Sequence, residues 1–541
     1  MAAIGRKKMA HSQKHPHGRH PHPSYQKPKQ DDERYCHPLG TGFRPAFHAL
    51  WHLHVLQIVD KLSEYGGEPW EGAASVAMGN KNTGKKAVSQ RKDKGDTDTQ
   101  VPVPPRPARI ALIDTPVDYK HPNLCGAMDT GLMRDFSHTA HGEFLRFKDG
   151  NENKGDKYFL DADVKSRAWL GDKASKQNTD LAKAIVAEIE HGHSSERPFR
   201  VFGAHGTAVA GLIGARPTSI CFREPAFLRG LKHENGEIID DVVLSSADWL
   251  PLPYCGINPF CRIVPISISA APSASMLRSA VEYAKLVEPD IVVIADSWDR
   301  PRDRAKPLSK DAQQMQEEEN KLWDRLHEDF MDLCQETIVL CAAGNEDLSH
   351  PVYPASACTD PHGPWAVGAC DDKGEDLSYS PTQTTVIGHH GWMIKTLSTE
   401  LPRFDREDGE RKIDPWAAID KDLDPPRLTG REFPARDIVT TDLPRQAGYN
   451  PSPYQYPEED ENDQYDNDQY YEIGSLFTRF AGTSASVAIA AGIVSLIPED
   501  KRKAINRENT QPIEQRDKLV KLFDWHTAND LFNSDNAPKA K

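Results

Sequence analysis

The sequence predicts an α/β fold of three layers: a mostly parallel central sheet flanked by helices, with long loop insertions. Several short runs are rich in β-branched and small apolar residues without polar alternation, which is typical of strands buried on both faces of a parallel sheet. Helical periodicity lies between these runs, and alternating strands and helices favour parallel pairing with right-handed crossovers. The length of 541 residues provides enough chain to bury a large core without a disulfide or a metal.

Polar residues stand where several of the predicted strands end. Functional residues of parallel sheets gather at the carboxyl ends of strands, which directs attention to Asp114, Ser297 and Asn345. Helices are predicted at 275–288 and 310–336, where apolar residues recur every three or four positions. The predicted strands are 109–114, 261–269, 290–295, 337–342 and 365–370.

The chain before residue 108 has a different composition. Residues 1–44 form a basic tail rich in His and Pro; we expect disorder there, and transient metal binding by its histidines is the alternative. Residues 45–65 carry apolar side chains at helical spacing and predict one amphipathic helix, which packs on the main domain or on a protein partner. Residues 66–107 are rich in Gly, Lys, Asp and Pro and predict a flexible linker.

Charge and composition exclude several classes of protein. Residues 1–100 hold 16 basic and 10 acidic side chains and the remainder holds 50 and 71, so the acidic body argues against nucleic acid as a partner. The basic start is not followed by the apolar segment of a signal peptide, so we expect a cytoplasmic or otherwise intracellular protein, with secretion left open. Nine irregularly spaced cysteines, several in apolar segments, indicate reduced thiols.

Two segments offer an acid and an imidazole. Asp114 ends the buried run RIALID, where a carboxylate can orient a neighbouring imidazole, although an Asp there can also simply cap a turn. His205 precedes Gly206-Thr207 and an apolar, small-residue helix, so its ring can face a cleft. Taken alone, His205 could also be a core histidine whose ring nitrogens are hydrogen-bonded and which has no catalytic role.

A third segment, 480–497, has 18 residues without charge, the length of a short membrane span. It is rich in Ala, Ser, Thr and Gly and therefore only weakly lipophilic, so we expect a helix buried in protein and no membrane partner. Ser484 would lie near the helix N-terminus, beside free N–H groups that favour developing negative charge.

In this order, the three segments resemble the Asp, His and Ser signatures of the subtilases, the subtilisin-like serine proteases. The segment CAAGNED at 341–347 resembles the family's oxyanion-asparagine segment, and 275–298 resembles its substrate-cleft region. The resemblance covers about 109–497. It implies a subtilisin-like peptidase domain at 108–498, insertions near 129–195, 216–258 and 381–474, and a polar C-terminal tail with a short helix at 499–541.

The resemblance also implies roles. Asp114 would orient His205, His205 would act as general base and then acid, and Ser484 would be the nucleophile. Asn345 would donate its side-chain amide to the oxyanion. The substrate would be a polypeptide, and neither metal nor cofactor is required; structural Ca²⁺ is common in the family, with no ligands assignable here. The implied cleft residues are Ser297, Trp298, Asp299, Ala343 and Gly344.

The sequence departs from the family pattern at several positions. Pro116 and Asp299 stand where the family usually has Gly, and Ala485 to Ala488 replace its usual sequence after the serine. The acidic residues Asp296 and Asp299 predict a negative cleft edge and a preference for basic residues near the scissile bond. The acidic run at 457–472 predicts a solvated, disordered insertion, with an acidic exosite or a Ca²⁺ loop as alternatives.

Two functions remain open at this point. The first is an active serine endopeptidase that hydrolyses peptide bonds through an acyl-enzyme. The second is a catalytically silent subtilase fold used for binding or regulation. All four catalytic positions are filled, which favours the enzyme.

Overall fold

The computed structural model describes fifteen stretches of the 541-residue chain, and the strands and helices below belong to them. They include nearly all of the segments from which the sequence predicts strands and helices. The described residues are 50–63, 107–145, 161–191, 203–221, 249–252, 254–298, 310–360, 362–381, 392–399, 419–420, 427–428, 438–443, 448–449, 476–504 and 522–533.

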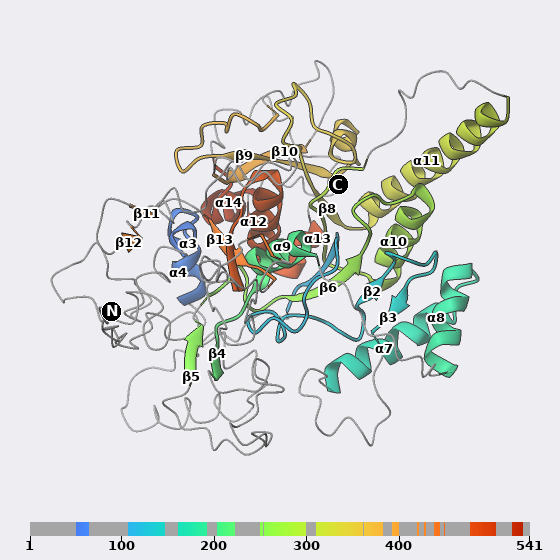
Figure 1. Cartoon of the computed structure of the whole chain (residues 1–541), viewed down its shortest axis with the longest axis horizontal. Helices are drawn as coiled ribbons and strands as arrows, with labels where there is room; N and C mark the ends of the chain where they lie inside the picture. The colour runs from blue at the N-terminus through green and yellow to red at the C-terminus, as the bar shows by residue number, and fades with distance from the viewer. Residues whose placement is uncertain are drawn as a thin grey trace, which may run out of the picture.

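An eight-stranded sheet forms the middle layer (Figure 1). Its order is β10-β9-β8-β7-β1-β6-β2-β3, and every neighbouring pair is parallel except β2 and β3. The predicted α/β class is therefore confirmed. The strands are β1 (Arg109–Asp114), β2 (Arg134–Asp135), β3 (Glu143–Phe144), β6 (Arg262–Ser267), β7 (Ile291–Ile294), β8 (Ile338–Ala342), β9 (Trp365–Cys370) and β10 (Trp392–Leu397).

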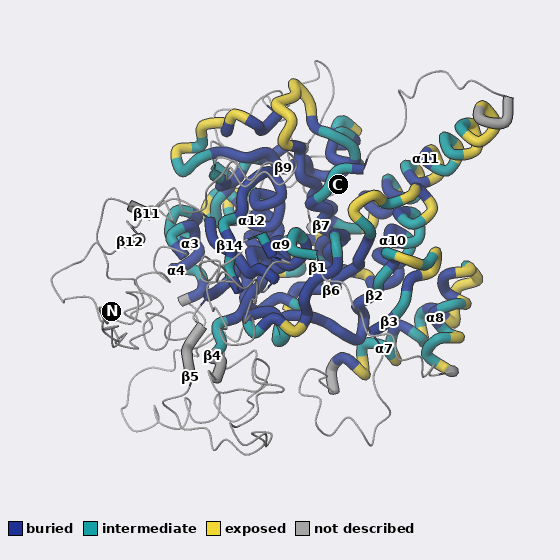
Figure 2. Tube along the Cα trace, viewed as in Figure 1, coloured by how far each residue is buried: buried dark blue, intermediate teal, exposed yellow. Residues whose placement is uncertain are grey.

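Both faces of this sheet are covered, which explains why its strands lack polar alternation. Successive side chains of a strand point to opposite faces. In β1, Ile110 and Leu112 pack in one core cluster, whereas Ala111 and Ile113 pack in the other. The central strands are accordingly buried along their whole length (Figure 2).

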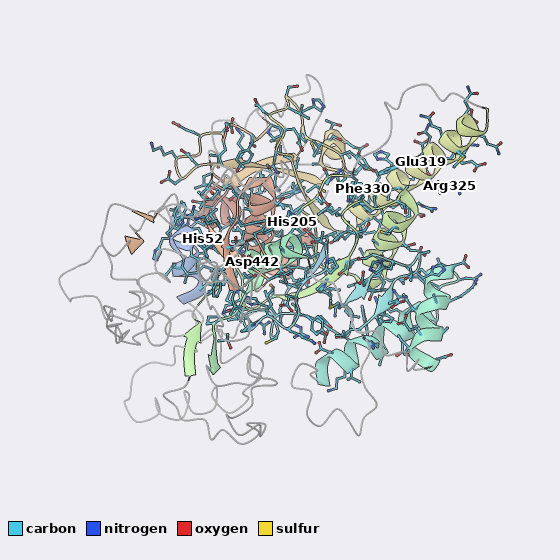
Figure 3. The ribbon with its side chains drawn as sticks, viewed as in Figure 1. His52, His205, Glu319, Arg325, Phe330 and Asp442 are labelled. Atoms are coloured by element: carbon cyan, nitrogen blue, oxygen red, sulfur yellow. The ribbon has the colours of Figure 1, made fainter. Side chains whose placement is uncertain are left out.

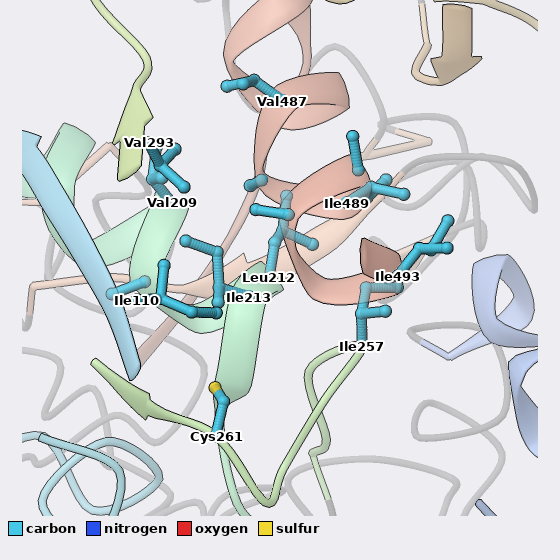
Figure 4. Close-up of a cluster of buried hydrophobic side chains, with 14 of the residues drawn as sticks. Ile110, Val209, Leu212, Ile213, Ile257, Cys261, Val293, Val487, Ile489 and Ile493 are labelled. Atoms are coloured by element: carbon cyan, nitrogen blue, oxygen red, sulfur yellow. The ribbon is translucent and has the colours of Figure 1, made fainter. Parts of the chain in front are cut away.

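One face is covered by the helices that matter most for the site. Helix α9 (Ala204–Gly214) and helix α12 (Gly482–Leu496) contribute Val209, Leu212 and Ile493 to the cluster that meets Ile110 of β1 (Figure 4). The small residues of both helices allow close packing on the sheet, and every residue of α12 is buried.

The opposite face is covered by four helices that are more polar on their outer sides (Figure 1). The second half of α11 packs against the core, whereas its first half extends away from the body (Figure 2) and leaves Met315 71% exposed. These helices are α7 (Asp161–Ala174), α8 (Asp180–His191), α10 (Ala274–Val287) and α11 (Lys310–Glu336).

The remaining elements are short. The helical ones include a 3₁₀ turn at Ala355–Thr359 and α13 (Glu499–Ala504), besides three helices from the two ends of the chain that are described below. None of the helices in the described stretches has the length and hydropathy to cross a membrane. The two-stranded pairs are β4 (Thr218–Cys221) with β5 (Trp249–Leu252), β11 (Ile419–Asp420) with β12 (Arg427–Leu428), and β13 (Val439–Thr441) with β14 (Phe477–Arg479).

Two of the predicted insertions contain parts of the domain core. The segment 381–474 includes β10, which is an edge strand of the main sheet, and β13, which packs on α9. The segment 129–195 includes β2 and β3 of the same sheet. Strands β2, β3 and β13 are only two or three residues long, and Lys395 and Thr396 interrupt the apolar sequence of β10, so none of the four stands out from the sequence.

The single helix predicted at 45–65 is in fact two short helices, α3 (Trp51–Val55) and α4 (Ile58–Ser63). The chain bends between them at Gln57, whose φ is 59°. Such a conformation is uncommon for a residue other than Gly. This conformation is held by the side-chain amide of Gln57, which donates from Nε2 to the Asp524 carboxylate at 3.1 Å.

The C-terminal segment is part of the domain and not only the polar tail predicted for 499–541. Helix α14 (Trp525–Asn533) buries Ala528 and Phe532 in the same cluster as α12, and Phe523 is also buried there. The Trp525 amide donates to the Leu56 carbonyl at 3.1 Å, so α14 is joined to the turn between α3 and α4. The leucines of α3 and α4 are thus buried against their own chain.

Candidate active site

The structure brings Asp114 and His205 together at the carboxyl end of β1. Asp114 is the last residue of the strand, and His205 is the second residue of α9. The His205 Nδ1 atom lies 2.8 Å from Asp114 Oδ1 and 3.1 Å from Oδ2. The Asp114 side chain is fully buried and that of His205 is 25% exposed, so the ring has one hydrogen-bonded edge and a second edge open to a reactant.

The Asp114 carboxylate is fixed by its neighbour Thr115. The Thr115 amide donates to Asp114 Oδ1 at 2.6 Å, and its hydroxyl donates to the same oxygen at 3.1 Å. The Thr115 hydroxyl also accepts the Gly206 amide at 2.9 Å. One hydroxyl therefore links the acid to the backbone next to His205.

Electrostatics favour the protonated form of His205. Burial lowers the pKa of His205. The charge of Asp114, the hydrogen bond with Asp114 and the charge of Asp296 raise this pKa by a larger amount. The pKa of His205 consequently lies above its usual 6.5. The imidazole is thus a stronger base than an isolated one.

Ser484 lies in the first turn of α12, where backbone N–H groups have no helical partner. Its hydroxyl donates to the Ala295 carbonyl, just beyond β7, at 2.8 Å. A serine has one hydroxyl proton, so in this arrangement it is not donated to His205. Phe480, four residues before the serine, packs edge-on against the His205 ring with centroids 5.5 Å apart.

Asn345 follows β8 and contacts the start of the same helix. Its Oδ1 accepts the Thr483 amide at 2.8 Å, which fixes the orientation of the side chain because a backbone N–H can only donate. The two Nδ2 protons therefore point away from Thr483. Gly482 has a φ of 83°, and a Cβ there would lie 3.1 Å from Nδ2, so only glycine leaves the amide clear.

The predicted cleft residues have different surroundings. Ser297 is half-buried, and Ala343 and Gly344 are buried at the end of β8. The Trp298 side chain is only 1% exposed and packs on Phe330 of α11, so it belongs to the core and does not line a cleft. The Trp298 amide also donates to the Tyr353 carbonyl at 2.8 Å, and the two rings pack edge-on, which holds Trp298 in the core. Asp299 lies outside the described residues.

Metal ligation has no support in the described part of the chain, where no group of three or more His, Cys, Asp or Glu side chains is placed to hold an ion. Seven described cysteines are free thiols. Burial raises the pKa of the Cys261 thiol to about 12. The His-rich tail at 1–44 and the acidic run at 457–472 lie outside the described residues.

Sequence reasoning missed the groups that surround these residues. Thr115 and Phe480 contact the acid and the imidazole directly, yet neither stands out among ordinary strand-end and helix-start residues. The sequence assigns Asp296 to a negative cleft edge, but it does not indicate that the charge of Asp296 raises the pKa of His205. A signal for Thr115 was its position directly after Asp114, at the end of a buried strand.

Comparison with known proteins identifies one family and several solved structures of low sequence identity. The family model described as the subtilase family matches residues 107–537. No curated protein matches the sequence. Among solved structures, the nisin leader peptidase NisP from Lactococcus lactis is 12% identical, with a TM-score of 0.39, over 79% of this chain and 87% of that one. The epidermin leader peptide processing serine protease EpiP from Staphylococcus aureus is 15% identical, with a TM-score of 0.39, over 81% and 78%.

Proposed function

Because this chain belongs to the subtilase family, we propose that it is a serine endopeptidase that hydrolyses peptide bonds of polypeptide substrates. The observation that carries the proposal is the 2.8 Å contact of the buried Asp114 with His205, which lies on a helix that packs in the same core cluster as the helix whose first turn holds Ser484. This is the arrangement that activates a hydroxyl for attack on a carbonyl.

The first half-reaction begins with a rotation of the Ser484 side chain. Its hydroxyl leaves the Ala295 carbonyl and donates to His205 Nε2, a contact that substrate binding often completes in such sites. His205 takes the proton as the oxygen attacks the scissile carbonyl. Asp114 holds the imidazole with Nε2 free and stabilises the imidazolium, without itself becoming protonated.

The developing oxyanion would be met by two donors. One is the Asn345 side-chain amide, whose other end is fixed by Thr483, and the second is the Ser484 backbone amide. His205 then gives its proton to the leaving amine as the peptide bond breaks. In the second half-reaction, His205 deprotonates a water that attacks the acyl-enzyme, and then returns this proton to the Ser484 oxygen as the new carboxyl end is released.

A fluorophosphonate probe tests this proposal without knowledge of the substrate. We expect the folded full-length protein to be labelled on Ser484, and peptide mapping to place the label there and not on Ser486. Ser486 is a buried serine of the same helix, so it serves as the internal comparison. A folded protein that stays unlabelled would support the alternative, a silent subtilase-fold module for binding or regulation.

The pH dependence of labelling reports on His205. Because the neutral imidazole is the active form, we expect the labelling rate to rise with pH through an inflection above 6.5, the usual pKa. Asp296→Asn removes one charge that raises the pKa of His205, so its inflection should move to lower pH. An inflection that stays in place in Asp296→Asn would contradict this assignment.

Removal of the Asn345 amide should slow catalysis without changing substrate affinity. We expect Asn345→Leu to lower kcat by about 10²–10³-fold, with KM nearly unchanged, because the amide is a donor to the transition state. Hydrolysis of fluorogenic casein measures the effect. The matched control is Asn258→Leu, a buried asparagine whose amide donates to Ser495, at the far end of α12. An equal loss in both variants would mean that folding, not oxyanion binding, is affected.

A further inference from the structure

The helix turn that carries His205 is held by threonine hydroxyls from the loop after β1, from the turn itself and from β13. From the β1 side, Thr115 accepts the amide of Gly206, the residue after the histidine. Within the turn, the Thr207 hydroxyl donates to the Gly203 carbonyl at 2.8 Å and accepts the Asp118 amide at 3.0 Å.

From the other side, two consecutive threonines of β13 bind the same turn. The hydroxyls of Thr441 and Thr440 donate, each at 2.7 Å, to the carbonyls of Thr207 and Ala208. Both threonines are fully buried. A side chain at Gly211 would collide with both hydroxyls, so a glycine allows the strand to approach the helix.

The antiparallel hairpin of β13 and β14 leads to the proposed nucleophile. Strand β13 pairs with β14, and β14 is followed directly by Phe480 and α12. Phe480 packs on the His205 ring. Asp442, the residue after β13, is fully buried and is labelled with His205 in Figure 3. One arm of the hairpin thus binds the helix of His205, and the second arm leads into the helix of Ser484.

We infer that Thr440 and Thr441 are positioning residues, whose hydroxyls fix α9 so that His205 stays in register with both Asp114 and Ser484. The inference rests on the proposed function. Their role is geometric: the carbonyls they bind lie inside a helix and also accept its own amides, so these carbonyls do not need the hydroxyls for satisfaction. A displacement of about 1 Å in a reacting group can cost about 10²-fold in rate.

The test separates the contribution of the threonine hydroxyl from that of the threonine shape. Valine keeps the shape of threonine and removes the donor, whereas serine keeps the donor and removes a methyl group. For Thr440→Val/Thr441→Val we expect kcat to fall about 10²-fold with KM within about 2-fold, and for Thr440→Ser/Thr441→Ser we expect kcat within about 3-fold of wild type. The labelling inflection of the valine variant should move to lower pH, because a loosened His205 contacts Asp114 less well.

Each outcome decides between the proposals. If wild type is labelled and the valine variant keeps the kcat and the inflection pH of wild type, the positioning role is overturned and the endopeptidase proposal stands. Equal losses in the valine and serine variants show a packing role and overturn it too. Wild type that is not labelled overturns both proposals. If the double valine variant does not fold, the single Thr440→Val and Thr441→Val variants decide by the same inflection.

Discussion

Ser484→Ala is expected to lower peptide hydrolysis by about 10⁶-fold and to abolish fluorophosphonate labelling. In the proposed mechanism this hydroxyl forms the acyl-enzyme, and alanine has no group that can replace it. The substitution removes one oxygen from a small-residue helix, so the fold should be retained. Casein hydrolysis, labelling and thermal unfolding of the full-length protein measure these three effects.

The matched control for this variant is Ser486→Ala. Ser486 lies two residues later in α12, is fully buried, and donates to the Thr396 carbonyl at 3.2 Å. Its replacement costs a similar hydrogen bond without touching the reacting atoms, so activity should stay close to that of wild type. Measurable labelling of Ser484→Ala at another serine would assign the nucleophile elsewhere.

Asp114→Asn is expected to lower kcat by about 10⁴-fold at neutral pH. An asparagine amide can donate to His205 Nδ1, which favours the imidazole form that carries its proton on Nε2. That form cannot accept the serine proton. The loss of the carboxylate charge also removes the main effect that raises the pKa of His205, so the remaining activity should reach its plateau at lower pH.

Asp135→Asn provides the comparison for this substitution. Asp135 ends β2 at the same level of the sheet, since both Asp114 and Asp135 pair with Ser267 of β6. It is not bound to a histidine among the described contacts; its carboxylate accepts the Ser137 amide. We expect nearly full activity and an unchanged inflection for Asp135→Asn. Similar losses in both variants would show that Asp114 supports the sheet and not His205.

Much of the fold could be predicted because buried parallel strands leave a clear pattern. The runs that become β1, β6, β7, β8 and β9 are apolar on both faces, and the structure bounds them within two residues of the prediction. The helices at 275–288 and 310–336 were equally clear from their spacing. The residues with candidate roles follow strand ends or begin helices, which is where the chemistry of a parallel sheet is expected.

The rest depends on contacts between distant parts of the chain. The partners of Thr440 and Thr441 lie more than 230 residues earlier, and no local pattern marks a hydroxyl that will bind a helix carbonyl. The bend at Gln57 depends on Asp524, which lies 467 residues away. Strand β10 is as long as β1 and β9, but Lys395 and Thr396 interrupt its apolar sequence, so only its pairing with β9 identifies it.

The packing of α14 against α12 and the α3–α4 turn has a consequence for synthesis of the protein. Phe523 and Phe532 complete the cluster that holds the helix of Ser484, yet they emerge from the ribosome after it. At about 5–20 residues per second, the delay between Ser484 and Phe532 is roughly 2–10 s. During that interval the core beneath the serine lacks two aromatic rings, each stabilising it by about 1.5–3 kcal/mol. Order of translation therefore delays completion of this core until after the helix of Ser484 has been synthesised.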